Sequence, residues 1–295
     1  MVNRLQEQGK VKIGFIGAGK VGFTLGKFLA LNGMCISGYC SRSMESARSA
    51  ARFVGGECFL LPSELVHASD IVFLTVPDDA LHPVYGQIRD LDLRGKILCH
   101  CSGSLSAAEI FSDLAEKGAS CCSVHPLFPV NNPRESYRTV GSAVFCLEGD
   151  EPALGTCRRM LEDAGVRVRL IEPRFKTLYH AACVFSSNCL CALVNTSCEL
   201  LARCGFDRDD ARESLAPLIR SSMERLSTAG PAAALTGPVE RGDAATIRKH
   251  LQVLPEEDRE LYRQLGMALV KLAREKHPDK TYTEVLDVLC GTEKN

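Results

Sequence analysis

The sequence predicts an α/β domain, built on a parallel sheet with helices on both faces, followed by an all-helical domain. Short apolar runs alternate with helical patterns up to about residue 172, and a glycine-rich turn joins the first run to the first helical pattern. Beyond residue 173 the chain shows helical periodicity only. We therefore expect two domains, residues 1–172 and 173–295.

The expected strands of the first domain are apolar on both faces, which is typical of a parallel sheet covered on both sides. These strands are expected at 11–16, 34–40, 57–61, 70–77, 95–103, 119–129, 140–149 and 166–172. Helices are expected between them, at about 20–32, 43–54, 78–88, 106–118 and 152–165. The second domain should contain helices at 175–205, 208–230, 243–254 and 256–277. Ser106 with Glu109, and Asp243, are expected as helix N-caps.

Composition argues against nucleic-acid and membrane functions. The chain has 295 residues, 45% of them hydrophobic and 24% charged, and a formal net charge of -1. It has no excess of positive charge to hold a phosphate backbone. The N-terminus lacks the apolar stretch and cleavage site of a signal peptide, and no window reaches about 18 uninterrupted apolar residues. We expect a soluble protein of the cytosol.

The chain contains fifteen cysteines, which is a high number. Most lie inside apolar runs, where a free thiol behaves as a small buried hydrophobic group. A reducing compartment suits this pattern. A metal site at Cys99, Cys101, Cys121 and Cys122 is the alternative, but their C-x-C and C-C spacings differ from the C-x2-C pairs of structural zinc. We expect reduced thiols and no metal.

Gly17, Gly19 and Gly22 form a G-x-G-x-x-G motif in the context that dinucleotide binding requires, between a strand and a helix. The first glycine allows a tight turn, the second lets the backbone approach a pyrophosphate, and the third lets the helix pack close to the strand. The helix N-terminus adds free N–H groups for the anion. We therefore expect a Rossmann domain whose loop also includes Ala18, Lys20 and Val21.

The end of the second strand favours NADP over NAD. An acidic residue there would bind the ribose hydroxyls of NAD, whereas this chain has Ser41, Arg42 and Ser43. Arg42 could pair with a 2'-phosphate in a bidentate manner, although it could also be a solvated loop residue. Val76 and Pro77 follow the fourth strand and should lie near the adenosine or the nicotinamide ribose.

Two further strands end in polar groups that could bind a substrate. Ser102, Gly103 and Ser104 offer hydroxyl and N–H groups for a carboxylate or a carbonyl oxygen, or form an ordinary turn. His125 precedes a proline, so its backbone is extended. A histidine at the end of a central strand suits a cleft, although structural histidines are also common.

The first helix of the second domain carries polar residues on one sector. With Lys176 at zero, His180 lies near 40°, Ser187 near 20°, Asn195 near 100° and Asn188 near 120°, at about 100° per residue. Burying these groups without partners would be costly, so they are either satisfied within the protein or line a polar cleft. We favour the cleft.

Lys176 is the first candidate for the proton donor or oxyanion stabiliser, because an ammonium group stabilises a developing alkoxide. His180 competes for this role, and Tyr179 lies at the edge of the sector. Arg241, in a glycine- and proline-rich break between later helices, could bind an anionic substrate or a phosphate.

The segments IGFIGAGKVG, HCSGS, HPLFP, KTLYHAACVFSSN and LTGPVERGD, in this order, resemble a bacterial family that joins a Rossmann-like NADP oxidoreductase domain to a helical DUF2520 domain. The resemblance covers nearly the whole chain. It implies a helical domain similar to the C-terminal domain of 6-phosphogluconate dehydrogenase, a substrate bound between the domains, and a homodimer formed through the helical domain. It also implies that Lys176 acts on the substrate carbonyl and that Asn188 contacts the substrate.

The wider superfamily includes ketopantoate reductases, pyrroline-5-carboxylate reductases and 3-hydroxyacid dehydrogenases. The leading hypothesis is therefore an NADP-dependent reductase of a small keto acid, with 2-dehydropantoate as the candidate. An imine reductase similar to pyrroline-5-carboxylate reductase is the second. A deazaflavin-dependent NADP oxidoreductase and a non-catalytic NADP-binding regulator are the remaining alternatives.

Overall fold

The computed structural model describes residues 11–292. The chain forms two compact units, the first ending at Ser186 and the second beginning at Ser187, and each is described by itself. The strands end at Leu170, close to the predicted boundary at 172, but the first unit continues through helix α8 (Lys176–Ser186). The buried side chain of Lys176, described below, holds the start of this helix on the sheet.

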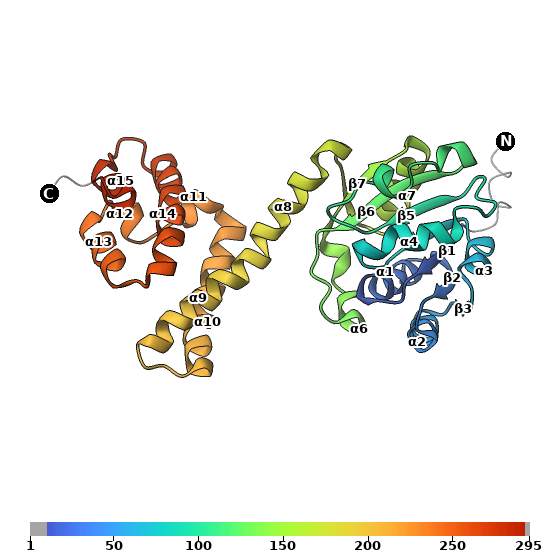
Figure 1. Cartoon of the computed structure of the whole chain (residues 1–295), viewed down its shortest axis with the longest axis horizontal. Helices are drawn as coiled ribbons and strands as arrows, with labels where there is room; N and C mark the ends of the chain where they lie inside the picture. Colours follow the sequence, from blue (N-terminus) through green and yellow to red (C-terminus); the bar gives the residue numbers. More distant parts are fainter. Residues whose placement is uncertain (1–10, 293–295) are drawn as a thin grey trace. The chain divides into compact units, whose positions relative to one another are not determined.

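The first unit contains one eight-stranded sheet with the order β3-β2-β1-β4-β5-β6-β7-β8 (Figure 1). Its strands are β1 (Lys12–Ile16), β2 (Cys35–Cys40), β3 (Glu57–Cys58), β4 (Ile71–Leu74), β5 (Ile97–His100), β6 (Ser120–Pro126), β7 (Val144–Gly149) and β8 (Arg167–Leu170). Strands β1 to β6 are parallel. The predicted Rossmann α/β sheet, with the reversal of strand order between β1 and β4, is confirmed.

The prediction of an entirely parallel sheet is wrong at its far edge. Strand β7 pairs antiparallel with β6, and β8 then pairs parallel with β7. The connection from β6 to β7 holds only the short helix α6 (Pro133–Ser136) and the 3-10 turn Val140–Ser142. A parallel connection needs a crossover, usually a longer helix, so this short segment returns the chain in the opposite direction.

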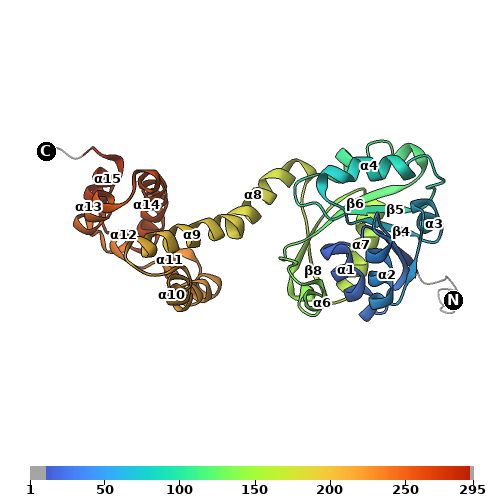
Figure 2. The ribbon, with the colours of Figure 1, turned by 60° about the horizontal axis from the view of Figure 1, so that its bottom comes forward.

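Helices cover both faces of the sheet, as the apolar strands predicted (Figure 2). One face packs against α1 (Lys20–Leu31), α2 (Met44–Val54), α6 and α7 (Glu151–Asp163). The other packs against α3 (Pro62–His67), α4 (Asp78–Ile88) and α5 (Ala107–Ile110). Buried rings such as Phe15 and Phe73, which stack at 5.4 Å, make up the first of these cores.

The predicted helix at 106–118 is largely wrong. Ser106 forms the expected capping box with Glu109, but α5 ends at Ile110 and only the 3-10 turn Ala115–Lys117 follows. The predicted helix at 175–205 is also interrupted. It divides into α8 and α9 (Asn188–Arg203) at Ser187, whose φ and ψ of -131° and -72° are not helical.

The second unit is entirely helical. Besides α9 it contains α10 (Arg208–Ala229), α11 (Pro231–Ala234), α12 (Pro238–Arg241), α13 (Ala244–Val253), α14 (Glu256–Lys276) and α15 (Thr283–Cys290). Asp243 caps α13 as predicted, accepting a hydrogen bond from the Thr246 N–H at 3.0 Å. The core of this unit comes from α12 to α15.

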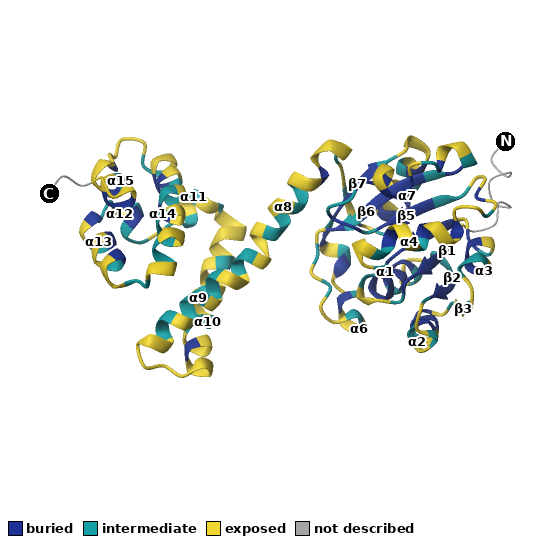
Figure 3. Ribbon diagram, in the orientation of Figure 1, coloured by how far each residue is buried: buried dark blue, intermediate teal, exposed yellow. Residues whose placement is uncertain are grey.

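Helices α9 and α10 contribute almost nothing to that core. No residue of α9 is buried, and Ala211 is the one buried residue of α10 (Figure 3). Within residues 11–292, one helical segment, Pro173–Arg203, has the length and hydropathy that a membrane-crossing helix needs, although no membrane-protein feature accompanies it. A helix that packs against a protein partner passes the same test.

Candidate functional site

The turn between β1 and α1 has the geometry that a pyrophosphate-binding loop requires. Gly17 has a φ of +110°, and a Cβ there would lie 2.5 Å from the carbonyl oxygen of Thr75. A Cβ at Gly22 would lie 2.3 Å from Thr75 Oγ1, so this glycine lets α1 pack onto the end of β4. A Cβ at Gly19 would meet nothing closer than 3.9 Å, which leaves the outer side of the loop open. The roles predicted for the three glycines fit this geometry.

The remaining residues of this loop lie where a dinucleotide needs them. Ala18 is half-buried, Lys20 is exposed and Val21 is half-buried at the start of α1. No side chain caps this helix, so the N–H groups of its first turn are available to an anion. Val76 Cγ1 would lie 3.0 Å from a Cβ on Gly17, which places this side chain against the loop; Pro77 is exposed beside it and caps α4.

The end of β2 carries the predicted basic group. Arg42 is exposed and forms no ion pair with any residue between 11 and 292, so its guanidinium is available to a phosphate. Ser41 is half-buried, and Ser43 uses its hydroxyl to cap α2, accepting from the Ser46 N–H at 3.2 Å. The loop and Arg42 together fit a dinucleotide that carries a 2'-phosphate.

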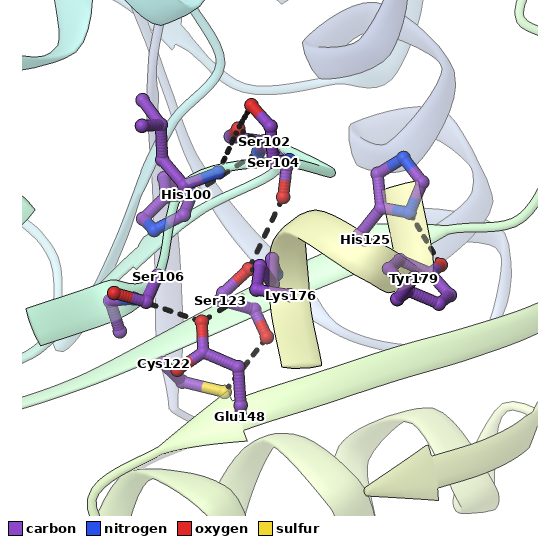
Figure 4. Close-up of polar contacts among 12 residues, drawn as sticks. His100, Ser102, Ser104, Ser106, Cys122, Ser123, His125, Glu148, Lys176 and Tyr179 are labelled. Atoms are coloured by element: carbon purple, nitrogen blue, oxygen red, sulfur yellow. Dashed lines mark hydrogen bonds and ion pairs between the residues drawn. The ribbon is translucent and has the colours of Figure 1, made fainter. Parts of the chain in front are cut away.

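The turn after β5 is organised by an aspartate that the sequence did not single out (Figure 4). Asp78 Oδ2 accepts hydrogen bonds from the hydroxyls of Ser102 and Ser104, each at 2.8 Å. The Ser102 hydroxyl oxygen also accepts from the N–H groups of Ser104 and Leu105. The hydroxyl protons of both serines are therefore engaged with Asp78.

Lys176 lies beneath this turn and is 1% exposed. Its Nζ is 3.5 Å from Glu148 Oε1 and donates a hydrogen bond to the Ser123 hydroxyl. The Ser123 hydroxyl in turn donates to the carbonyl oxygen of Ser102 at 3.4 Å. Burial lowers the pKa of Lys176, and Glu148 opposes that shift. The lysine is thus paired in the interior, connecting β6, β7 and the turn after β5.

His125 and His180 lie on the accessible side of the same turn. A Cβ on Gly103 would lie 2.9 Å from His125 Nε2 and 2.6 Å from His180 Cδ2, so both imidazole rings meet at this glycine. The two rings are 6.4 Å apart, centroid to centroid. His125 Nδ1 is 2.7 Å from the hydroxyl oxygen of Tyr179 (Figure 4). Glycine at 103 is therefore required for both rings to occupy their positions.

Burial keeps the histidines of β5 and β6 uncharged. The pKa of His125 falls to about 4, because burial and the nearby Lys176 and His180 disfavour its charged form. The pKa of His100 also falls to about 4, again mainly through burial. His100 is fully buried, and its Nδ1 accepts from the Ser102 N–H at 3.1 Å. His100 supports the turn, whereas His125 can face a ligand.

The polar sector predicted along one long helix is only partly present. Lys176 and His180 reach the groups described above. Ser187 and Asn188, which share a hydrogen bond of 2.9 Å, begin the second unit, and Asn195 bonds to Glu199 on the same helix. The break at Ser187 changes the helical phase, so the angular argument fails beyond Ser186. Arg241 ends α12 in the second unit and is exposed.

Three residues of the site were not predicted from the sequence. Asp78 was interpreted only as an acidic residue in the first turn of a helix, Glu148 lies within a strand, and Tyr179 was placed at the edge of the sector. A signal existed for Glu148, because a carboxylate inside an apolar strand requires a partner. Lys176 is that partner.

The fold places the first unit among the nicotinamide dinucleotide oxidoreductases, and family comparison agrees. Residues 2–126 match the family described as a Rossmann-like domain. Residues 143–269 match a domain of unknown function, DUF2520, which here includes β7 and β8 as well as helices. The chain is a two-domain protein of the Rossmann-like plus DUF2520 kind. No curated protein matches it.

Solved structures extend the likeness to nearly the full chain. Protein TM1727 from Thermotoga maritima is 27% identical, with a TM-score of 0.71 over 90% of this chain and 99% of its own. BF3122 from Bacteroides fragilis, provisionally named an NADP oxidoreductase, is 23% identical, with a TM-score of 0.67 over 91% and 98%. The pyrroline carboxylate reductase of Plasmodium falciparum, solved with NADP bound, is 15% identical, with a TM-score of 0.58 over 93% and 98%. The last two show the fold alone.

Proposed function

We propose that this chain is an NADP-dependent reductase of a small 2-keto acid, with 2-dehydropantoate as the leading candidate substrate. The carrying observation is that the glycine loop after β1 and the Gly103–His125–His180 group lie at the carboxyl ends of adjacent parallel strands. Ligands of open α/β sheets bind at this edge, where the strand order reverses. A dinucleotide site and a group of polar side chains thus share one edge of one sheet.

The chain's own residues would hold the cofactor. The glycine loop and the start of α1 would bind the pyrophosphate, and Arg42 would pair with the 2'-phosphate, which favours NADP. When bound, NADPH supplies the hydride. Replacing Arg42 with alanine should raise KM for NADPH roughly tenfold or more, the worth of one charged hydrogen-bonding group, and leave KM for NADH unchanged. Equal effects on both cofactors would contradict this role.

We assign the proton donor to His180 rather than to Lys176. Lys176 was the first candidate, but its ammonium group is buried and paired with Glu148. His180 is half-buried, and its ring reaches the open side of Gly103. Lys176 would support the reaction from beneath, through Ser123 and the carbonyl oxygen of Ser102.

A second candidate function, the reduction of an imine, is favoured by Asp78. Its carboxylate is exposed and forms no ion pair with the described residues, while both neighbouring serine hydroxyls donate to it. The turn after β5 therefore presents negative charge, which suits a cationic iminium nitrogen better than a substrate carboxylate. A keto acid would need an anion ligand elsewhere, and Arg241 is the candidate from the sequence.

We also propose that the protein is a cytosolic homodimer formed through its helical domain. Helix α9 buries none of its own residues, although it belongs to the most apolar segment of the chain. Apolar side chains on neighbouring helices are also exposed, Leu218 by 64% and Val253 by 81%. A second copy would remove such surface from water. Light scattering of the purified protein should give twice the monomer mass; a monomer at micromolar concentration would contradict the dimer.

Turnover decides among the functions. NADPH oxidation should be followed at 340 nm with 2-dehydropantoate, other branched 2-keto acids and pyrroline-5-carboxylate, and repeated with NADH. Reduction of a keto acid with NADPH preferred supports the leading proposal, and reduction of the imine alone supports the second. NADPH binding without any turnover would overturn both and favour the regulatory alternative, and oxidation of NADPH only with a deazaflavin would favour the deazaflavin-dependent one.

A further inference from the structure

The contact between His125 and Tyr179 joins two elements of the first unit through one short hydrogen bond. His125 lies on β6 and Tyr179 on α8, and His125 Nδ1 is 2.7 Å from the phenol oxygen. The rings meet edge to face, with centroids 5.5 Å apart at 87°. His125 Nε2 has no hydrogen-bond partner among residues 11–292 and faces Gly103. One nitrogen of the ring is therefore held, and the other is free for a ligand.

The chemistry of the pair determines which nitrogen carries the proton. A neutral imidazole has one N–H donor and one acceptor nitrogen. Its acceptor nitrogen is more basic than a phenol oxygen, so the Tyr179 hydroxyl donates to Nδ1. Burial supports this arrangement, because it lowers the pKa of His125 to about 4 and raises that of Tyr179. Both groups are neutral at pH 7, which leaves the imidazole proton on Nε2.

We propose that Tyr179 is a positioning residue that fixes His125 in the Nε2–H tautomer, and that His125 donates this N–H to the substrate atom that gains negative charge during reduction. The inference rests on the proposed reductase function. No proton leaves His125: as a hydride forms the new C–H bond, the electron pair of the C=O double bond moves to oxygen, and the Nε2–H stabilises that oxygen. The proton that completes the alcohol comes from His180 or water.

This role separates two substrate classes. A ketone oxygen accepts an N–H hydrogen bond, whereas a protonated imine nitrogen already carries a proton and would be repelled by one. His125 in the Nε2–H form therefore favours the carbonyl substrate. The aspartate at the turn after β5 favours the imine, so the tautomer of His125 bears directly on which reaction the site performs.

The tautomer can be measured without any substrate. In protein with 15N-labelled histidine, the ring nitrogens of His125, assigned by loss of its signals in His125→Asn, should show the Nε2–H form at pH 7. Tyr179→Phe removes the donor and fits the same space, so it should mix the two tautomers. Tyr137→Phe, a tyrosine elsewhere in the first unit, is the matched control and should leave the His125 signals unchanged. A predominant Nδ1–H form in the wild type, or an unchanged tautomer in Tyr179→Phe, would overturn the proposal.

Kinetics test the second half of the proposal. With a keto acid, Tyr179→Phe should lower kcat roughly tenfold while KM for NADPH stays constant, since one hydrogen bond in the reacting state is lost. Activity with pyrroline-5-carboxylate should fall less. Equal losses on both substrates would overturn the donor role. If the wild type reduces neither substrate, the donor role falls with the proposed function, while the NMR result still decides whether Tyr179 fixes the tautomer.

Discussion

Helix α8 takes part in two regions that treat polar groups in opposite ways. Beneath the turn after β5, Lys176 and Glu148 are buried and paired. Above it, His180 from the same helix meets His125 at Gly103, and Asp78 remains exposed. The buried pair spends its charge on holding strands and turn together, whereas the accessible groups keep theirs for a ligand. Substitutions below the turn should therefore change stability first, and substitutions above it should change activity first.

The largest effect should come from breaking the buried pair. Glu148→Ala leaves the Lys176 ammonium unpaired in the interior, which should lower the free energy of unfolding by about 3–5 kcal/mol. Urea denaturation measures the loss. The double variant Glu148→Leu with Lys176→Met removes both charges and should recover most of it. If Glu148→Ala were as stable as the wild type, the interior pair would have no structural role.

The second effect concerns pH and the buried His100. Its pKa in the folded protein is about 4, below the usual value near 6.5 for the unfolded chain. Between these values the unfolded chain binds a proton that the folded protein does not, so stability falls as pH drops from about 6.5 to about 4. The loss should approach roughly 3 kcal/mol, and His125 should add to it.

His100→Asn reports on this pH effect. Asparagine retains an acceptor for the Ser102 N–H but does not titrate in this range. Denaturation midpoints of the wild type and the variant should therefore converge as pH falls from 6.5 to 4. Parallel curves would show that His100 titrates normally.

The two regions also differ in how well the sequence predicts them. The alternation of strands and helices, the glycine motif and the position of Arg42 are local features, and the structure has the fold they predict. The pairing of Lys176 with Glu148 joins residues 28 apart in sequence, on different elements, and no local pattern indicates it. Likewise, one non-helical residue, Ser187, removed the phase relation on which the polar sector depended. Pairings and phase breaks depend on tertiary packing, which periodicity does not describe.

A substitution above the turn should give the reverse result of Glu148→Ala. Gly103→Ala would place a methyl group 2.6 Å from His180 Cδ2 and 2.9 Å from His125 Nε2, so both rings must move. We expect kcat to fall roughly tenfold, because small displacements of reacting groups are costly, while the free energy of unfolding changes by about 1 kcal/mol or less. Steady-state kinetics and denaturation of one preparation measure both quantities. A variant that unfolds easily but keeps its activity would reverse the assignment of the two regions.

The smallest effect should come from Asp78, and it sharpens the choice of substrate. Asp78→Asn keeps acceptors for the Ser102 and Ser104 hydroxyls but removes the exposed negative charge. An exposed charge contributes about 1 kcal/mol or less, so the ratio of kcat/KM for pyrroline-5-carboxylate to that for a keto acid should fall by up to about fivefold. Because the carboxylate is exposed, the ratio should also change less in high salt. An unchanged ratio would place Asp78 in the support of the turn alone, and the accessible region would then owe its substrate preference to His125 and His180.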